Sequence, residues 1–404
     1  MRTRHGASLR TPTIMNHNWE YKRLGDVCSF IGGGTPSKSN SSYYCGTIPW
    51  ATVRDMTKFE LSSTELSISE KAVAESATKI LPKGMIIIST HVGLGKICLL
   101  MQDTAINQDL KGISFLFNEI NKYFFSYWYQ SIANYIISNG KGATVKGVTL
   151  DFMKSLPIPT PSMQIQEKIV SELDKINEMI EIKRSQLKDL DALAQSLFYE
   201  TFGEPIDNPM RWNVGMLSDH ADFKNGLNFT PSDNGNKVKC LGVGDFKANR
   251  YIKAENLSEI SIVESISEDY LLTKGDIIFV RSNGNKALIG RSIMYVSNDS
   301  PATFSGFCIR CRYNSDILSP LFLSYYLSSR TVREYITSQG RGCNISNLNQ
   351  KILSSIPLML PPLSLQNQFA ARIEAIEKQK KRVEASIADL ETLLTSRMDY
   401  WFND

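Results

Sequence analysis

Two long stretches of the chain share a spacing of apolar residues that is typical of paired helices. Apolar residues recur four and three positions apart in both stretches, and the two patterns keep the same register at an offset of 200 residues. This spacing gives a helix a narrow apolar seam that packs against another helix. We predict two long helices that pair antiparallel as a coiled coil. The predicted helix-pairing residues are Ile169, Leu173, Ile176, Ile180, Leu187, Leu190 and Leu197 in the first helix, and Phe369, Ile373, Ile376, Val383, Ile387, Leu390 and Leu394 in the second.

Each seam contains a lysine where an apolar residue would continue the pattern, Lys183 in the first helix and Lys380 in the second. A lone polar residue in a seam penalises wrong registers, whereas a lysine at the seam edge can also extend into solvent; both interpretations stay open. A helix over about 164–202 would be on the order of 58 Å long. Domains at the two ends of such a rod would be separated by roughly 15–17 base pairs of duplex, which suggests a molecular ruler.

The rest of the chain is an internal repeat with a period near 200 residues. The segment Leu81-Pro-Lys-Gly-Met-Ile-Ile-Ile matches Leu272-Thr-Lys-Gly-Asp-Ile-Ile-Phe, and a tryptophan, Trp19 or Trp212, stands near the start of each half. A run of apolar residues after a Lys-Gly corner predicts a turn followed by a buried strand. Prolines near 157–161 and 357–362 end the globular part of each half.

We therefore predict a mixed α/β (α+β) fold of two tandemly repeated domains, each followed by a long helix. Antiparallel pairing of the two helices would relate the domains by an approximate two-fold axis. The predicted boundaries are 15–160 and 205–360 for the domains, and 161–204 and 361–404 for the helices. Residues 1–14 hold three arginines and precede a second methionine, so we expect an extension or an expression remnant outside the fold.

Charge follows the same boundaries. The formal net charge is +4, but 161–204 carries −4 and 361–404 carries −1, which leaves +9 elsewhere. Positive domains beside acidic helices suit contact with a polyanion through the domains and with other partners through the helices, although +9 is also common in soluble proteins. There is no apolar run of membrane-spanning length and no apolar signal-peptide core. Seven scattered cysteines indicate free thiols in a reducing cytoplasm.

The sequence shows no catalytic constellation. The four histidines are far apart, and Cys308-Ile-Arg-Cys311 lies in a strand-like run without the further ligands that a structural zinc site needs. The glycine-rich segments at 32–36 and 93–96 lack phosphate-loop spacing. We expect no catalytic residue, metal or cofactor in this chain.

Loops that combine Arg or Lys with amide, hydroxyl and glycine residues occur at equivalent places in both halves. Arginine and lysine can pair with guanine, and amides with adenine, while lysine binds phosphates. One such loop is typical of a solvated turn, but three in each repeat favour a DNA-binding surface. The predicted DNA-binding residues are Thr52, Arg54, Thr90, His91, Lys96, Lys141, Thr144 and Lys146 in the first domain, and Lys247, Arg281, Ser282, Asn283, Lys286, Arg341 and Asn344 in the second.

The side chains differ between the halves although the scaffold agrees, since Thr90-His91 falls where Arg281-Ser282 does. One scaffold with two surfaces would read two different sequences. The aromatic residues of segment 123–129 and of Tyr325-Tyr326 could suggest base stacking, but they lie on helix-like stretches, and we predict that they pack in the core.

With these motifs in place, the chain from Met15 onward resembles the specificity subunit of a type I restriction–modification system. The resemblance rests on two domain-plus-helix repeats, on the two Lys-Gly turns, and on the helix starts Pro-Ser-Met-Gln-Ile-Gln-Glu-Lys-Ile and Pro-Leu-Ser-Leu-Gln-Asn-Gln-Phe-Ala-Ala-Arg-Ile. At these helix starts the family usually has Glu-Gln, whereas Gln164-Ile-Gln166 and Gln366-Asn-Gln368 stand here, which affects the expected partner contacts.

The resemblance implies a subunit without activity of its own. Each of its two target-recognition domains would read one half of a split double-stranded DNA site, and the helices would set the gap. Two methyltransferase subunits would bind it and methylate adenine with S-adenosylmethionine, and two restriction subunits that use ATP and magnesium can join. The competing hypotheses are a coiled-coil adaptor that binds only proteins and a nuclease, which the empty motif search disfavours.

Overall fold

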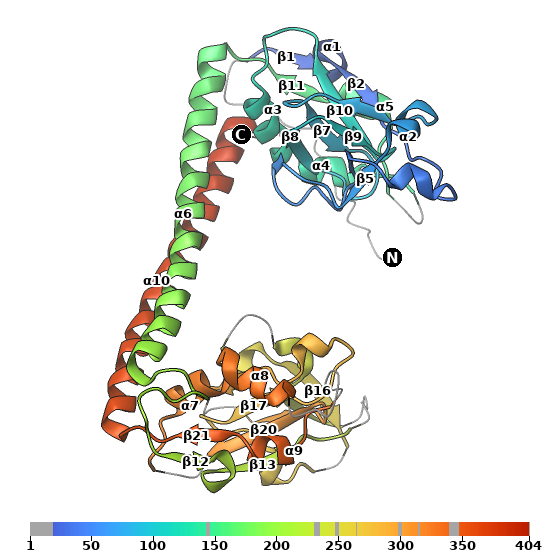
Figure 1. The fold of residues 1–404 in the computed structure, drawn as a ribbon. Coiled ribbons are helices and arrows are strands. Elements are labelled where there is room, and N and C mark those ends of the chain that lie inside the picture. Colours follow the sequence, from blue (N-terminus) through green and yellow to red (C-terminus); the bar gives the residue numbers. More distant parts are fainter. Residues whose placement is uncertain are drawn as a thin grey trace, which may run out of the picture. The chain divides into compact units, whose positions relative to one another are not determined.

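The computed structural model describes residues 19–142, 146–229, 235–246, 250–263, 265–297, 301–313, 316–338 and 347–403. The chain forms two compact units. Unit 1 combines residues 1–184 with 385–404, and unit 2 is the continuous segment 185–384. Two forty-residue helices, α6 (Met163–Phe202) and α10 (Leu363–Phe402), therefore each contribute one part to unit 1 and the other part to unit 2 (Figure 1). Among the described residues, no helix is long and apolar enough to cross a membrane.

Unit 1 contains three sheets. A five-stranded sheet has the order β2-β10-β7-β8-β4, a four-stranded sheet the order β5-β3-β9-β6, and β1 pairs with β11. The strands are β1 (Tyr21–Arg23), β2 (Cys28–Gly32), β3 (Ile48–Ala51), β4 (Glu60–Leu61), β5 (Leu66–Ile68), β6 (Lys79–Leu81), β7 (Ile86–Ser89), β8 (Ile97–Leu100), β9 (Thr104–Ile106), β10 (Leu110–Phe115) and β11 (Pro157–Pro159). The helices are α1 (Leu24–Val27), α2 (Glu70–Ala74), α3 (Lys122–Ser131), α4 (Ala133–Ser138) and α5 (Leu150–Ser155).

Unit 2 repeats this topology, except that its second sheet has three strands among the described residues where that of unit 1 has four. Its sheets are β13-β20-β17-β18-β15, β16-β14-β19 and β12-β21, and the pairs β4/β8, β15/β18, β3/β9 and β14/β19 are the parallel ones. The strands are β12 (Val214–Met216), β13 (Ala221–Asn225), β14 (Asn236–Leu241), β15 (Tyr251–Ile252), β16 (Ser258–Ile262), β17 (Ile277–Val280), β18 (Ser292–Tyr295), β19 (Ala302–Phe304), β20 (Cys308–Tyr313) and β21 (Pro357–Met359). The helices are α7 (Pro320–Leu327), α8 (Arg330–Ser338) and α9 (Gln350–Ser354). The predicted mixed α/β repeat is confirmed.

The two apolar runs after the Lys-Gly corners become the central strands β7 and β17. In β7, Ile86 and Ile88 face the core beneath α3, whereas Ile87 faces the core that includes Ala51 and Leu61. In β17, alternate residues likewise enter two different cores. Because both faces of these strands are covered, the runs are apolar without alternation. Gly84 and Gly275 precede them with φ of 81° and 96°, a left-handed conformation that glycine adopts without strain.

The aromatic residues of 123–129 pack in the core as predicted, except Tyr123, which is exposed. Phe124, Phe125, Trp128 and Tyr129 of α3 are buried in the core of unit 1, and Tyr326 of α7 is buried in that of unit 2. Cys308 and Cys311 of β20 enter different cores of unit 2, so they do not face one site. Among the described residues, no cluster of three or more His, Cys, Asp or Glu side chains could hold a metal.

Within each unit, the segments of α6 and α10 lie side by side and run in opposite directions (Figure 1). In unit 1, Arg184 of α6 forms an ion pair with Glu391 at 2.9 Å, and Glu172 pairs with Arg397. In unit 2, Lys380 Nζ lies 2.7 Å from Asp191 Oδ1. Lys380, a predicted seam residue, thus retains its charge beside an acid of the facing helix.

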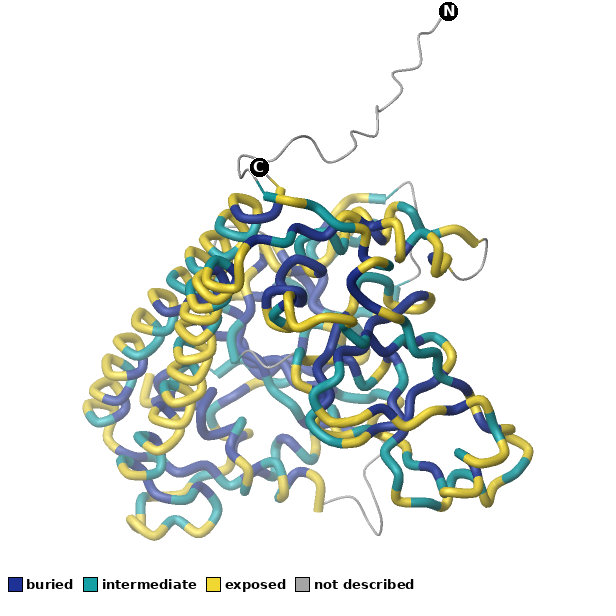
Figure 2. The backbone as a smooth tube through the Cα atoms, turned by 90° about the horizontal axis from the view of Figure 1, so that it is seen from above, coloured by how far each residue is buried: buried dark blue, intermediate teal, exposed yellow. Residues whose placement is uncertain are grey.

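The predicted helix-pairing residues form a continuous stripe of buried and partly buried positions, and the remaining faces are largely exposed (Figure 2). The stripe has two roles that the 4,3 spacing does not distinguish. Ile169 and Leu173 enter the core of unit 1, and Phe369 and Ile373 enter that of unit 2. Leu197 is only partly buried because its neighbour Phe198 occupies the core. Leu187, Leu190, Ile387 and Leu390 lie partly exposed in the middle of the helices.

A buried glutamine attaches the start of each long helix to its unit. Gln166 accepts a hydrogen bond from Asn121 N (2.8 Å) and donates to the carbonyls of Glu119 (2.8 Å) and Pro161 (2.9 Å). Gln366 makes the same three bonds, to Ser319 N, Ile317 O and Pro361 O, each 2.8 Å long. Both side chains are completely buried. They therefore act inside the fold, whereas their neighbours Gln164 and Gln368 are exposed.

Candidate nucleic-acid interface

Four loops of unit 1 come together at one end of its sheets. The turn after β3 is closed by Asp55, whose Oδ2 accepts hydrogen bonds from Thr52 N (2.7 Å) and Thr52 Oγ1 (2.9 Å). Thr52 is thus occupied in shaping the turn, whereas Arg54 at its tip is exposed. Lys96, from the β7–β8 loop, donates from Nζ to Val53 O at 3.3 Å and ties the second loop to the first.

Thr90 is a support of this surface rather than part of it. Its side chain is 1% exposed, and its backbone N donates to Asp109 O (2.9 Å) while its carbonyl accepts from Val148 N (2.9 Å). The Thr90 hydroxyl is buried and donates to Asp109 O at 3.2 Å, so its exposure gives no support to the prediction that Thr90 contacts DNA, which stays a prediction. His91, next in the chain, is exposed, with Nδ1 3.9 Å from Asp109 Oδ1.

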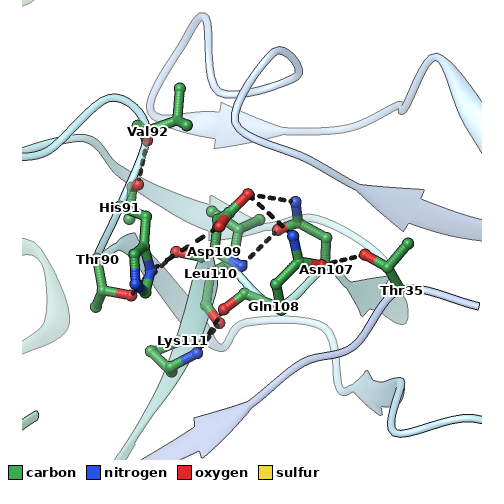
Figure 3. A network of polar contacts seen from close by, with 10 residues as sticks. Thr35, Thr90, His91, Val92, Asn107, Gln108, Asp109, Leu110 and Lys111 are labelled. Carbon is green, nitrogen blue, oxygen red and sulfur yellow. Dashed lines mark hydrogen bonds and ion pairs between the residues drawn. The ribbon is translucent and has the colours of Figure 1, made fainter. Parts of the chain in front are cut away.

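A polar loop that sequence reasoning missed lies next to Thr90 and His91 (Figure 3). Residues 107–109 join β9 to β10, and Asp109 Oδ2 accepts from Asn107 Nδ2 at 3.1 Å and from Gln108 Nε2 at 3.4 Å. Gln108 also accepts a hydrogen bond from the Thr35 hydroxyl. Lys111 Nζ donates to Gln108 O at 2.7 Å, and burial lowers the pKa of Lys111. The segment has no basic residue, so the search for Arg- and Lys-bearing loops did not detect it.

The loop borders an open groove of about 730 Å³ that carries both signs of charge. Its lining includes Trp50, Arg54, Asp55, Glu65, Gln108 and Asp109. Carboxylates and amides at a groove mouth can accept and donate hydrogen bonds at base edges, while Arg54 can pair with a phosphate or with guanine.

The fourth loop is the segment between α4 and α5. Lys141 and Gly147 exchange two backbone hydrogen bonds of 2.9 Å, which hold these two residues together next to His91. Lys141 and Lys146 are both exposed there. Thr144 lies outside the described residues, as do Lys247, Arg341 and Asn344 of the second repeat. The structure thus brings His91, Lys96, Lys141 and Lys146 to one surface with Arg54.

Unit 2 has the same framework, fixed by the same backbone hydrogen bonds. Arg281 N donates to Phe307 O (2.8 Å) and Arg281 O accepts from Leu348 N (2.8 Å), as Thr90 does with Asp109 and Val148. Ser305 N donates to Leu241 O (2.9 Å), as Asn107 N does to Ala51 O (3.1 Å). Arg281 therefore stands at the position of Thr90, and loop 305–307 at that of loop 107–109.

A glycine holds the central loop in place in each unit. A Cβ on Gly33 would lie 2.2 Å from Ile106 O, and one on Gly226 would lie 2.1 Å from Ser305 O. Backbone cannot move aside cheaply, so these two positions admit only glycine. This close approach explains Gly33, and the nearby backbone of Ala77 and Thr78 likewise explains Gly34, so these glycines are accounted for without phosphate binding.

The side chains on the two frameworks differ. Arg281 is partly exposed, and its Nη1 donates to Gly306 O at 3.3 Å. Ser282 and Asn283 follow it, and Asn283 Oδ1 accepts from Asn285 N at 2.7 Å. Lys286 is exposed at the start of a short 3₁₀ turn. Where unit 1 presents Asp109, unit 2 presents the 61% exposed ring of Phe307.

Two repeats of one domain, each with an equivalent polar loop surface and a long helix attached by a buried glutamine, define a tandem recognition protein. The sequence matches the type I restriction modification DNA specificity domain twice, over residues 16–192 and 209–392. The chain belongs to this family.

Individual relatives agree. The chain is 24% identical over 405 residues to the StySPI specificity subunit of Salmonella potsdam, covering 94% of this chain and 86% of that protein. It is 28% identical over 230 residues to the MjaIX specificity subunit of Methanocaldococcus jannaschii. This match covers 52% of this chain and 53% of that protein, so the chain spans about half the length of this relative. A chain from a structural study of complex assembly and conformational transition of the type I restriction–modification system has the same fold, with a TM-score of 0.63, 19% identity and coverage of 97% and 99%.

Proposed function

We propose that this chain is the DNA-recognition subunit of a type I restriction–modification complex. Each unit reads one half of a bipartite target in double-stranded DNA, and the chain itself has no catalytic step. Adenine methylation takes place in bound methyltransferase subunits, which use S-adenosylmethionine and remove the target base from the stack. Restriction subunits that use ATP and magnesium complete the complex in the cytoplasm.

One observation carries this proposal: a single loop framework occurs twice with different side chains. Loops 107–109 and 305–307 have equivalent backbone hydrogen bonds, yet one presents a carboxylate and an amide and the other a phenyl ring. Bases are read by side chains at groove edges, whereas the backbone framework only positions them. A protein that binds one partner twice would repeat the side chains as well.

The long helices support the other half of the proposal. Their exposed faces are acidic in α6 and mixed in α10, which disfavours contact with DNA and favours contact with protein. We propose that these faces dock the methyltransferase subunits and that the helices fix the gap between the half-sites.

The test is sequencing of modified bases in DNA from cells that express this chain with its methyltransferase, compared with cells that express the methyltransferase alone. We expect a split motif containing methylated adenine only when this chain is present. Replacing residues 205–360 by the same segment of a relative should change one half of the motif and leave the other. A folded, copurifying complex that methylates no motif would refute the proposal and favour a protein adaptor.

Point variants refine this test. Arg281→Ala and Lys96→Ala should reduce methylation in cells. Each phosphate contact that is lost should also lower, by about one, the slope of the logarithm of the DNA-binding constant against the logarithm of salt concentration. Arg330→Ala is the matched control because its side chain is 83% exposed on α8 and pairs with Glu334 of the same helix. Cleavage of DNA by the purified chain with magnesium would instead indicate an enzyme.

A further inference from the structure

The most exposed aromatic ring of the described recognition loops is that of Phe307, at the tip of the β19–β20 loop. Its ring is 61% exposed, although a phenylalanine that served the fold would be buried. The backbone around it is held tightly. Phe307 O accepts from Arg281 N (2.8 Å) and Ser282 N (3.4 Å), and Phe307 N donates to Ser305 Oγ (3.3 Å). The ring is therefore presented to solvent from a fixed position.

The residue before Phe307 is contacted by one positively charged and one polar side chain. The Arg281 guanidinium is anchored to Gly306 O, one residue before Phe307, and retains further N–H donors for a phosphate or a base. Asn228 packs against Gly306, since a Cβ there would have to displace the Asn228 side chain. An apolar ring next to hydrogen-bonding groups on the same loop suits a DNA groove, in which apolar and polar atoms of the base edges alternate.

The equivalent position in unit 1 indicates what the ring reads. Asp109 occupies it, and its carboxylate is oriented by Asn107 and Gln108. In the major groove, a carboxylate accepts from the amino group of cytosine, whereas an apolar side chain contacts the 5-methyl group of thymine. One position on a common framework thus offers two complementary kinds of base recognition.

We propose that Phe307 contacts the 5-methyl group of a thymine in the half-site read by unit 2, and that positions 109 and 307 determine specificity. This inference rests on the proposed function. To the proposed function it adds the residue that recognises a base and the chemical group of the base that is recognised.

The experiment uses the complex of the full chain with its methyltransferase and duplexes of the target found by modified-base sequencing. In the half-site assigned to unit 2 by the segment replacement, each thymine is changed in turn to uracil, which removes only the methyl group. Binding is measured by fluorescence anisotropy at one fixed salt concentration. For the wild type we expect one position at which uracil weakens binding about fourfold, the effect of one buried methyl-sized group.

Phe307→Ala should bind the unmodified duplex roughly tenfold more weakly, because the ring no longer buries its surface. At the sensitive position it should show no additional loss with uracil. Phe117→Ala is the matched control: Phe117 is 58% exposed, follows the far end of β10 in unit 1, and should leave every affinity unchanged. Circular dichroism of each variant establishes folding.

The outcomes separate the two proposals. If the wild type has no specific target, the proposed function fails. If it binds a split target but no thymine-to-uracil change weakens binding, or the half-site has no thymine on either strand, the Phe307 inference is refuted and the proposed function stands. Equal uracil effects in wild type and Phe307→Ala also refute it. If Phe307→Ala does not fold, the uracil series on the wild type still decides, together with Phe307→Leu, which keeps an apolar contact.

Discussion

Replacing Gln166 by alanine should destabilise unit 1 because it removes the three hydrogen bonds with which this side chain attaches the start of α6 to that unit. The amide is completely buried, and its partners Asn121 N, Glu119 O and Pro161 O are backbone groups that cannot turn toward solvent. A typical buried hydrogen bond contributes about 1 kcal/mol net, and each buried group left without a partner costs about 1–3 kcal/mol. Since water can enter the vacated space and bind some of the backbone groups left without a partner, we expect the free energy of unfolding to fall by about 2–4 kcal/mol.

Urea unfolding followed by tryptophan fluorescence measures this loss. Four of the five tryptophans, all except Trp212, belong to unit 1, so the signal reports mainly on that unit. With an m-value on the order of 3 kcal/mol per M, the midpoint should fall by about 1 M. Gln166→Glu should be worse at pH 7 than at pH 5, because a buried carboxylate facing two carbonyl oxygens is tolerated only when protonated.

The matched control is Gln164→Ala, two residues earlier in the same helical turn, where the side chain is exposed. It should change the midpoint by less than about 0.2 M. Gln366→Ala makes the identical lesion in unit 2 and should leave the tryptophan transition of unit 1 nearly unchanged. A Gln166→Ala protein with the wild-type midpoint would show that these three bonds do not secure the helix.

Three further predictions concern the helices and the thiols. The Arg397 guanidinium lowers the pKa of Glu172, so this pair stabilises the fold above the ordinary glutamate pKa and loses its effect as the pH falls through the lowered value. Glu172→Gln should therefore reduce Tm by about 1–2 °C at pH 7 and by progressively less as the pH is lowered. Burial alone would lower the pKa of Lys380, but Asp191 and Glu377 raise it overall. Lys380→Met should change the free energy of unfolding by less than about 1 kcal/mol, because the ion pair with Asp191 is partly solvated. A loss above about 2 kcal/mol in urea unfolding would contradict this interpretation. Iodoacetamide should label the exposed Cys45 in the native protein but not the buried thiols of Cys28, Cys98 and Cys240. Burial raises the pKa of each of these three thiols to about 12. Peptide mass analysis before and after urea measures the labelling, and labelling of the three buried thiols in the native protein would refute the prediction.

The repeat and the long helices could be predicted because they are periodic in the sequence. The 4,3 spacing locates both helices, and the Lys-Gly corners locate β7 and β17, since each signal depends on residues adjacent along the chain. The equivalence of Thr90 and Arg281 was also predictable from the spacing between motifs. Local pattern was sufficient for all of these features.

The recognition surface was only partly predictable because its centre is assembled from distant strands. Loop 107–109 has the composition of an ordinary turn, and only the pairing of β3 with β9 and of β7 with β10 places it beside Arg54 and His91. Thr90 has a surface-type residue identity but is covered by Asp109 and Val148. Likewise, Phe307 appears apolar in the sequence, and its exposure depends on how loop 305–307 is anchored.

The division of each long helix between the two units has a consequence for biosynthesis. Unit 1 is completed by the last residues of the chain: Trp401 stacks on Trp19 with ring centroids 6.2 Å apart, and Phe402 lies 5.4 Å from Phe124. The first domain to leave the ribosome therefore waits for α10, and the rings of Trp19 and Phe124 lack these contacts until that helix has been synthesised. A chain cut short near its C-terminus would expose these rings and be a substrate for proteolysis. Only a copy that includes the end of α10 yields a finished first domain, which couples the folding of the first half to the synthesis of the second.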